Sequence, residues 1–284
     1  MRNSAKDLLR IHLAVLLFGL SGLFGRLVSL PAVIIVLGRV FFASVSMFAM
    51  FAARRKKVRL AETRDYLMLA LAGLILAAHW TAFFMSIKVS TIAIAVLTYS
   101  TFPLFITFAE PLLFGEKLKK SDLFAAIAMF AGVILIVPEF NLSNDITVGV
   151  LWGMASSVTF AAMTLINRRY ASKYEGTVIA FYEQITATAA LIPSLFLTTF
   201  SATLSDMVML LLLGVVFTAA AHSMFIGGMK TIKAQSAAMI SSLESVYGIA
   251  AAAILLKEIP QFDEIAGGAI ILGAALYSTV KSYK

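Results

Sequence analysis

The sequence predicts an all-α integral membrane protein with ten transmembrane helices, arranged as two inverted five-helix repeats around a central cavity. Of its 284 residues, 61% are hydrophobic and 13% are charged, and the mean hydropathy is +0.94. This composition is too apolar for a soluble domain of this size. The apolar runs number five in each half of the chain, and an odd number requires two related halves to lie upside down relative to each other.

The apolar runs predict helices because they continue for about 20 residues, whereas the strands of a membrane barrel alternate over about 10 residues. Every connection between them is short, so any activity must reside among the helices. We assign residues 1–140 to the first repeat and residues 141–284 to the second. The predicted spans are 8–29, 32–53, 66–87, 92–114, 121–138, 147–167, 178–199, 207–229, 235–256 and 263–281.

Lys and Arg residues set the expected orientation, because cytoplasmic loops of membrane proteins carry an excess of them. With ten spans, all but four of the 23 Lys and Arg residues fall on one side of the membrane. The exceptions are Arg26, Arg39, Lys88 and Lys257. We therefore expect a multi-pass protein of the cytoplasmic (inner) membrane with both termini in the cytoplasm, and we read the formal charge of +8 as a topology signal.

A weak internal repeat accompanies the equal number of spans in each half. Shifting the sequence by 142 residues brings several residues of the first half onto similar ones in the second. The correspondences are Lys88 with Lys230, Ala95 with Ala237, Glu116 with Glu258, and His79 with the neighbour of His222. Two equivalent halves predict a site at the interface between them.

Three segments show a family resemblance: His79–Lys88 (HWTAFFMSIK), Ala93–Pro103 (AIAVLTYSTFP) and Gly115–Leu118 (GEKL). Residues 234–258 repeat this pattern and end in Leu-Lys-Glu. The sequence resembles an EamA-type member of the drug/metabolite transporter superfamily over its whole length. The resemblance implies a five-plus-five inverted repeat whose central cavity exports small metabolites, commonly amino acids or related compounds. In the second half Ser245 stands where the first has Pro103, so the two halves need not bend alike.

Four ionisable residues lie inside predicted spans, where each charge costs roughly 2.5–3.5 kcal/mol unless it meets a partner or water. They are Arg39, Glu110, Glu183 and Glu244. Either they pair as structural bridges, with Glu110 close to the headgroups, or they serve a substrate. In the second case Arg39 neutralises a substrate carboxylate or holds one of the acids ionised, and one acid exchanges a proton during transport.

Two histidines and an aromatic cluster occupy the middle of the third and eighth spans. His79 and Phe83 are four residues apart and therefore share a helix face, and with Trp80 they form an aromatic cluster. His222 lies at the matching place in the second half. Such rings can stack on a planar substrate or hold a cation, although aromatic residues in membrane helices also simply pack. We expect no metal, because two histidines without cysteine or suitably spaced carboxylates form a poor ligand set.

Two polar interruptions occur at equivalent depths of the fourth and ninth spans. The first contains Tyr99 and Pro103, and the second contains Ser241, Glu244 and Ser245. Proline removes one backbone hydrogen bond and frees a carbonyl. Interrupted helices at matching positions predict a binding site at the membrane midplane, while the simpler alternative is hydrogen bonding between helices.

From these observations we expect a secondary transporter that moves a small metabolite, most simply outward, by alternating access. Protons are the expected coupling ion, and an uncoupled facilitator is the alternative. The sequence holds no nucleotide-binding motif and implies no cofactor, no nucleic-acid partner and no enzymatic activity. The alternatives are an exporter of drugs or cationic compounds, and a receptor or scaffold without transport. The residues expected at the substrate site are Arg39, His79, Trp80, Phe83, Tyr99, Pro103, Glu183, His222, Ser241, Glu244 and Ser245.

Overall fold

The computed structural model describes residues 2–114, 120–136, 140–232 and 234–282, and all of the regular secondary structure in these ranges is helical. Eight helices of the described residues are long and apolar enough to cross a membrane. The apolar part of α7, Leu123–Ile136, is shorter. The prediction of an all-helical membrane protein is confirmed.

Most helices begin and end within a few residues of the predicted spans, and several spans consist of two or three consecutive helical segments. The first half contains α1 (Arg2–Ser21), α2 (Phe24–Leu27), α3 (Ala32–Ala53), α4 (Thr63–Val89), α5 (Ile92–Tyr99), α6 (Phe102–Phe114) and α7 (Lys120–Ile136). The second half contains α8 (Asp145–Ala171), α9 (Gly176–Leu191), α10 (Ser194–Leu197), α11 (Leu204–Gly214), η1 (Val215–Ala220), α12 (Ala221–Gly228), α13 (Ala234–Ser241), α14 (Leu243–Ala251), η2 (Ala252–Leu256) and α15 (Phe262–Ser282).

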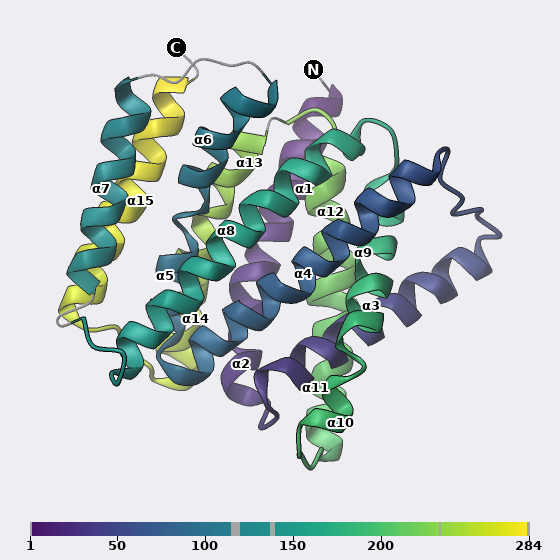
Figure 1. Cartoon of the computed structure of the whole chain (residues 1–284), viewed down its shortest axis with the longest axis horizontal. Coiled ribbons are helices and arrows are strands. Elements are labelled where there is room, and N and C mark those ends of the chain that lie inside the picture. Colours follow the sequence, from purple (N-terminus) through teal and green to yellow (C-terminus); the bar gives the residue numbers. More distant parts are fainter. Residues whose placement is uncertain (1, 115–119, 137–139, 233, 283–284) are drawn as a thin grey trace.

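The helices pack side by side, with the start of α1 and the end of α15 at the same end of the bundle (Figure 1). Helices α7 and α15 form a pair along one edge (Figure 1). A Cβ on Gly132 would lie 2.8 Å from the carbonyl oxygen of Gly267, and a Cβ on Gly267 would lie 2.6 Å from that of Gly132. Glycine at both positions therefore permits the close approach of these two helices.

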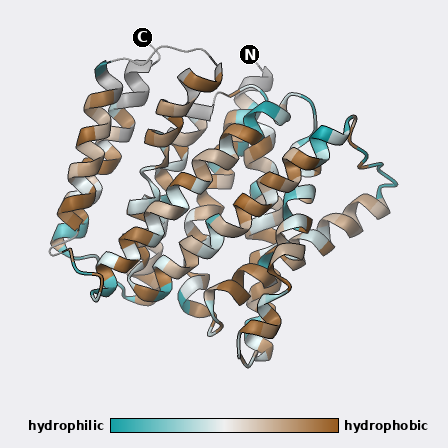
Figure 2. Cartoon of the chain, viewed as in Figure 1, coloured by the Kyte–Doolittle hydropathy of each residue, from teal (hydrophilic) through white to brown (hydrophobic). Residues whose placement is uncertain are grey.

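Hydrophobic residues predominate along the helices, and hydrophilic residues gather at the helix ends and in the loops (Figure 2). Large apolar side chains such as Phe48 (64% exposed), Leu67 (67%) and Phe196 (85%) lie on the outer surface of the bundle. In a soluble protein such exposure would promote aggregation, whereas in a bilayer it places these side chains in the lipid.

Two spans are interrupted near their middles, and the interruptions lie 142 residues apart as the sequence repeat predicts. Helix α5 ends at Tyr99 and α6 begins at Phe102, while α13 ends at Ser241 and α14 begins at Leu243. Pro103 has no N–H to give to the fourth residue before it, which explains why the first interruption precedes it. The hydroxyl of Ser100 bonds the Val96 carbonyl oxygen at 2.8 Å and lies 2.5 Å from the Ser245 hydroxyl, joining the two interrupted spans.

The eighth span contains a π-helical segment, η1, that the sequence pattern does not predict. Within it the hydroxyl of Thr218 donates to the carbonyl oxygen of Leu213 at 2.8 Å, five residues earlier. One extra residue in a helical turn rotates the side chains that follow, and such π-bulges occur frequently at functional sites. The segment sets the direction of His222 in α12.

Candidate functional site

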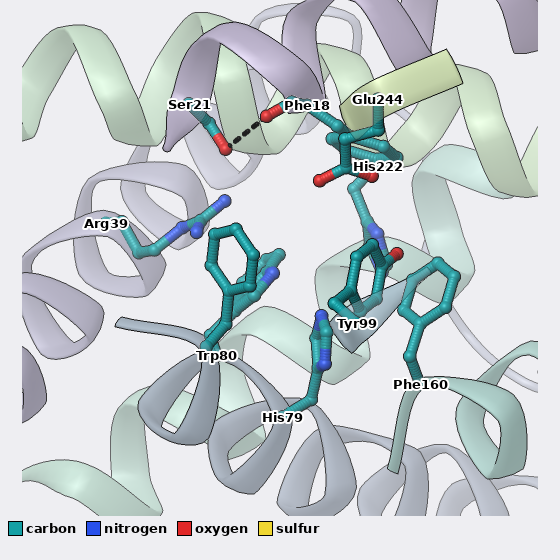
Figure 3. A pocket seen from close by; sticks show the side chains of 10 residues that line it. Phe18, Ser21, Arg39, His79, Trp80, Tyr99, Phe160, His222 and Glu244 are labelled. Carbon is teal, nitrogen blue, oxygen red and sulfur yellow. Dashed lines mark hydrogen bonds between the residues drawn. The ribbon is translucent and has the colours of Figure 1, made fainter. Parts of the chain in front are cut away.

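A small cavity lies between α3, α4 and α8, the last turn of α1, the end of α5, and the first turns of α12 and α14. Its volume is about 20 Å³, which is room for about one water molecule. The side chains therefore nearly close the site in this conformation, and the central cavity expected from the sequence is small here. The cavity is lined by Phe18, Ser21, Arg39, His79, Trp80, Phe83, Tyr99, Phe160, His222 and Glu244 (Figure 3).

Arg39 projects from α3 into this cavity and is 1% exposed (Figure 3). Its Nε donates to the Thr218 hydroxyl at 3.0 Å, and its Cζ lies 3.7 Å from the centroid of the Trp80 ring and 5.4 Å from that of Phe84. A desolvated cation over an aromatic ring gains about 2 kcal/mol. One hydrogen bond and two rings thus hold the guanidinium in the apolar interior.

Glu244 is the acidic residue in the lining of the cavity. It lies in the first turn of α14, just after the interruption of the ninth span, and is 5% exposed. Two of the expected site residues, the basic Arg39 from the first half of the chain and the acidic Glu244 from the second, therefore line the same cavity.

Glu183 does not pair with Arg39, which was one of the alternatives from the sequence. Its Oε2 lies 2.6 Å from Nε2 of His222, and the two side chains are 0% and 1% exposed. His222 lines the cavity while Glu183 stands behind it in α9. A charge on either side chain would be costly in the apolar interior, so this hydrogen bond stabilises both Glu183 and His222 where they are buried.

His79 has its own partner in the second half of the chain. Its Nδ1 lies 3.0 Å from the carbonyl oxygen of Ser156 and 2.9 Å from the Ser156 hydroxyl. The ring lies 5.0 Å from the Phe160 centroid and 5.5 Å from the Tyr99 centroid. Aromatic and imidazole rings thus form one wall of the cavity, facing the Arg39 side.

Several buried polar atoms around the cavity have no hydrogen-bond partner among the residues that the structure describes. These include Oε1 of Glu183, Oε2 of Glu244, both side-chain polar atoms of Gln184 and the Ser241 hydroxyl. Leaving a buried polar group unpaired costs about 1–3 kcal/mol, so native proteins rarely do so without water or a ligand. Of these residues Glu244 lines the cavity, so its Oε2 is an acceptor for a polar molecule bound there.

Four expected site residues do not line the cavity, and one of them is Glu183, which stands behind His222. Ser245 donates to the Val96 carbonyl oxygen at 2.8 Å and joins two helices, Ser241 is buried beside the interruption in the ninth span, and Pro103 follows the interruption in the fourth. The Glu110 side chain and the Gly115–Leu118 motif lie outside the described residues.

Four residues at the site escaped the sequence analysis: Phe18, Ser21, Phe160 and Thr218. The first lies in the Phe18-Gly19 pair, which aligns with Trp152-Gly153 when the starts of the two halves are superimposed. Thr218 had no signal, since a single Thr in an apolar helix is common.

Ionic clusters close the bundle at both of its ends. At the end where α1 starts, Lys173 Nζ lies 2.7 Å from Asp65 and 2.8 Å from Glu62, and these hydrogen bonds raise the pKa of Lys173 well above its usual value. At the opposite end Arg26 pairs with Glu258 at 3.3 Å and also bonds the Ser90 carbonyl oxygen. Arg26 is therefore part of a contact between helices and does not extend freely to the membrane surface.

The chain matches the EamA-like transporter family twice, over residues 7–137 and over residues 147–280. It is 23% identical over 172 residues to the "Uncharacterized transporter YxxF" of Bacillus subtilis (strain 168), a match that covers 59% of this chain and 55% of that relative. It is 22% identical over 241 residues to an S-adenosylmethionine uptake transporter of Rickettsia bellii (strain RML369-C), covering 84% of this chain and 80% of the relative.

A solved crystal structure shares the fold, with a TM-score of 0.71, 20% identity and 98% coverage of both chains. The two family matches confirm the resemblance seen in the sequence. Members of this family are transporters and not enzymes. The chain therefore belongs to the EamA-like transporter family of the drug/metabolite transporter superfamily, and it is a multi-pass integral membrane transporter.

Proposed function

We propose that the protein is a secondary transporter of the cytoplasmic membrane that exports a small metabolite by alternating access, with the central cavity as its binding site. The observation that carries this proposal is that Arg39 and Glu244, one from each half of the chain, are both buried and line the same nearly closed cavity. A transporter must pass through such an occluded conformation when it exchanges one access route for the other.

We further propose two inverted five-helix halves, residues 1–140 and 141–284, that enclose the site and rock against each other. The packing supports this division because contacts recur with the halves exchanged. Helix α4 packs on α8 as α12 packs on α1, and α6 packs on α8 as α14 packs on α1. The interruptions in the fourth and ninth spans occupy equivalent positions as well.

Individual contacts near the site also recur between the halves. A Cβ on Gly73 in α4 would lie 2.7 Å from the Glu183 carbonyl oxygen, and a Cβ on Gly214 in α11 would lie 2.8 Å from the Arg39 carbonyl oxygen. Glycine at position 73 allows α4 to approach the helix of Glu183, and glycine at position 214 allows α11 to approach the helix of Arg39 about as closely. In this proposal Arg39 and Glu183 are counterparts with opposite charge.

The lining suits a molecule that combines a carboxylate with a cationic or aromatic group, such as an amino acid or a related compound. Arg39 offers a positive charge, Glu244 a negative charge, and the rings of Trp80 and Tyr99 offer stacking surfaces. A cationic compound without a carboxylate is the alternative, since Glu244 and the rings would suffice for it. One relative is named for S-adenosylmethionine uptake, so the direction of transport is part of the test.

The test compares the metabolites released by cells that contain the native protein, the Arg39→Gln variant or neither. We expect at least one small metabolite to accumulate outside only with the native protein. Identical profiles in all three would refute export, and accumulation inside the cells instead would assign uptake. Repeating the assay in vesicles with the proton gradient collapsed distinguishes proton coupling from facilitated diffusion.

Both termini are proposed to lie in the cytoplasm, because the sequence places nearly all Lys and Arg residues outside the helices on the same side of the membrane as the termini. The observed placement of the start of α1 and the end of α15 at one end of the bundle supports this orientation (Figure 1). A reporter fused after Lys284 should be active only in the cytoplasm. Accessibility of that reporter from outside would reverse the assignment.

A further inference from the structure

A second, larger cavity opens at the end of the bundle where α1 starts. Its volume is about 470 Å³. It lies between α1, the loop from α8 to α9, and α12, and we call it the vestibule. Its polar lining includes Arg10, Lys173, Thr177, Ser223 and Lys230.

Helix α9 begins in the wall of the vestibule at Gly176. Glu175 precedes it but makes no capping hydrogen bond with its side chain, because its carboxylate is bound to Lys56. The first N–H groups of a helix lack partners within the helix, and the helix dipole makes this end partially positive. The start of this 16-residue helix therefore favours an anion.

A buried hydroxyl in the lining of the vestibule lacks a partner. Ser223 is 9% exposed, and its hydroxyl has no hydrogen bond among the residues that the structure describes. Its neighbour His222 lines the central cavity. Neighbouring residues, Ser223 and His222, thus line the vestibule and the proposed transport site, and the Ser223 hydroxyl is free to form a hydrogen bond.

Most charged side chains of the vestibule are paired, including Glu175, which is bound to Lys56. Arg10 is paired with Asp7 at 2.8 Å, and Lys173 is held by Asp65 and Glu62. Lys230 is exposed, and none of the ion pairs found in the described ranges includes it. One basic side chain therefore remains available beside the start of α9.

Unpaired polar groups also lie on α8 between the turns that line the two cavities. Thr164 and Asn167 lie on α8 between Phe160, which lines the cavity, and Ala171, which lines the vestibule. Both side chains are buried, and their polar atoms have no partner in the described part of the chain. Such groups would gain hydrogen bonds if water or a ligand entered between the helices.

We propose that the vestibule binds the carboxylate or phosphate group of a soluble ligand before that ligand enters the central cavity. Lys230 and the start of α9 supply the positive field, and the Ser223 hydroxyl donates a hydrogen bond to the anion. The assignment of this site to ligand loading rests on the transport function proposed above. The binding of an anion does not depend on that function.

The chain contains no cysteine, so Ser223→Cys introduces a single reactive thiol. A membrane-impermeant, positively charged methanethiosulfonate should modify this thiol in vesicles of phosphatidylcholine when it is added on the side of the vestibule. Sodium phosphate or acetate at about twice its dissociation constant should slow the modification about threefold. Lys230→Gln in the same background should remove that protection.

The matched control is Ser143→Cys, an exposed position in the loop before α8 at the opposite end of the bundle. Its modification should be unaffected by either anion and should require reagent on the other side. In the native chain phosphate should raise the unfolding temperature, and in the Lys230→Gln variant it should not. This measurement keeps the proposal testable if the cysteine variant folds poorly.

Two results would overturn the proposal: a folded Ser223→Cys variant that the reagent fails to modify, or modification that neither anion slows. Protection that requires phosphatidylglycerol in the vesicles and is absent with soluble anions would assign the site to a lipid headgroup and end the loading role. Because these assays read thiol reactivity and stability, they can fail while export of a metabolite is still observed.

Discussion

The Cζ of Arg39 lies 3.7 Å from the centroid of the Trp80 ring, and both side chains are almost completely buried, at 1% and 6% exposed. A guanidinium can stack flat on an aromatic ring and still bond Thr218 through Nε. A lysine ammonium lacks this planar geometry. The residue type at position 39 therefore matters beyond its charge.

Replacing Arg39 with Lys should abolish or strongly reduce transport although the positive charge is kept. The ammonium loses both the hydrogen bond to Thr218 and the stacking on Trp80, which together contribute about 2–3 kcal/mol. Trp80→Phe, which retains a ring, is the milder comparison. Transport is measured in cells with equal amounts of each variant, and native rates for Arg39→Lys would show that charge alone suffices.

Replacing Glu244 with Gln should impair export without lowering the amount of folded protein. The amide has nearly the same shape as the carboxylate but leaves the Arg39 charge unbalanced in the cavity. Folded protein is measured by gel filtration in detergent, and export by release of the identified metabolite. Unchanged export would exclude Glu244 from the mechanism.

Replacing Glu183 with Ala should destabilise the protein by about 3–5 kcal/mol, because His222 loses the partner of a fully buried pair. Glu183→Gln keeps a hydrogen-bonding group and should cost less. If this pair exchanges protons, the Gln variant should also lose the dependence of transport on the proton gradient. Unfolding curves and transport at imposed gradients test the two parts, and equal stability of Glu183→Ala and the native protein would contradict the first.

Replacing Gly73 with Ala should destabilise the bundle by about 1–3 kcal/mol, because the added Cβ would lie 2.7 Å from the Glu183 carbonyl oxygen and the helices must separate. Gly273 in α15 is the control, since a Cβ there would meet nothing within 4 Å. Gly273→Ala should be neutral or stabilising by up to about 1 kcal/mol. Similar unfolding temperatures for the two variants would argue against tight packing at Gly73.

Much of the fold follows from the sequence because the bilayer imposes strong constraints. A run of about 20 apolar residues can satisfy its backbone in a membrane only as a helix, so the position of α3 follows directly from residues 32–53. The two interruptions could be located for a similar reason. Proline at position 103 and the serines at 241 and 242 disturb a helix at matching depths of the two halves.

The candidate site was harder to predict, because side-chain partners depend on how the helices rotate against one another. Hydropathy shows that Arg39 must avoid lipid, but it does not reveal that the guanidinium stacks on Trp80 and that Glu183 bonds His222 instead. The π-helical segment at Val215–Ala220 changes the rotation of α12 without any distinctive residue. No sequence pattern indicates that Thr218 bonds Arg39 or that Phe160 lines the cavity.

The most direct test of alternating access asks whether the central cavity can be reached from both sides of the membrane. Ser21 lines this cavity, and the chain has no cysteine of its own, so Ser21→Cys places one thiol at the centre. We predict that an impermeant thiol reagent modifies it when added from the inside and also when added from the outside, and that the transported metabolite slows both reactions. If folded protein reacted from neither side, the cavity would be a closed packing feature, and the proposed mechanism would be wrong.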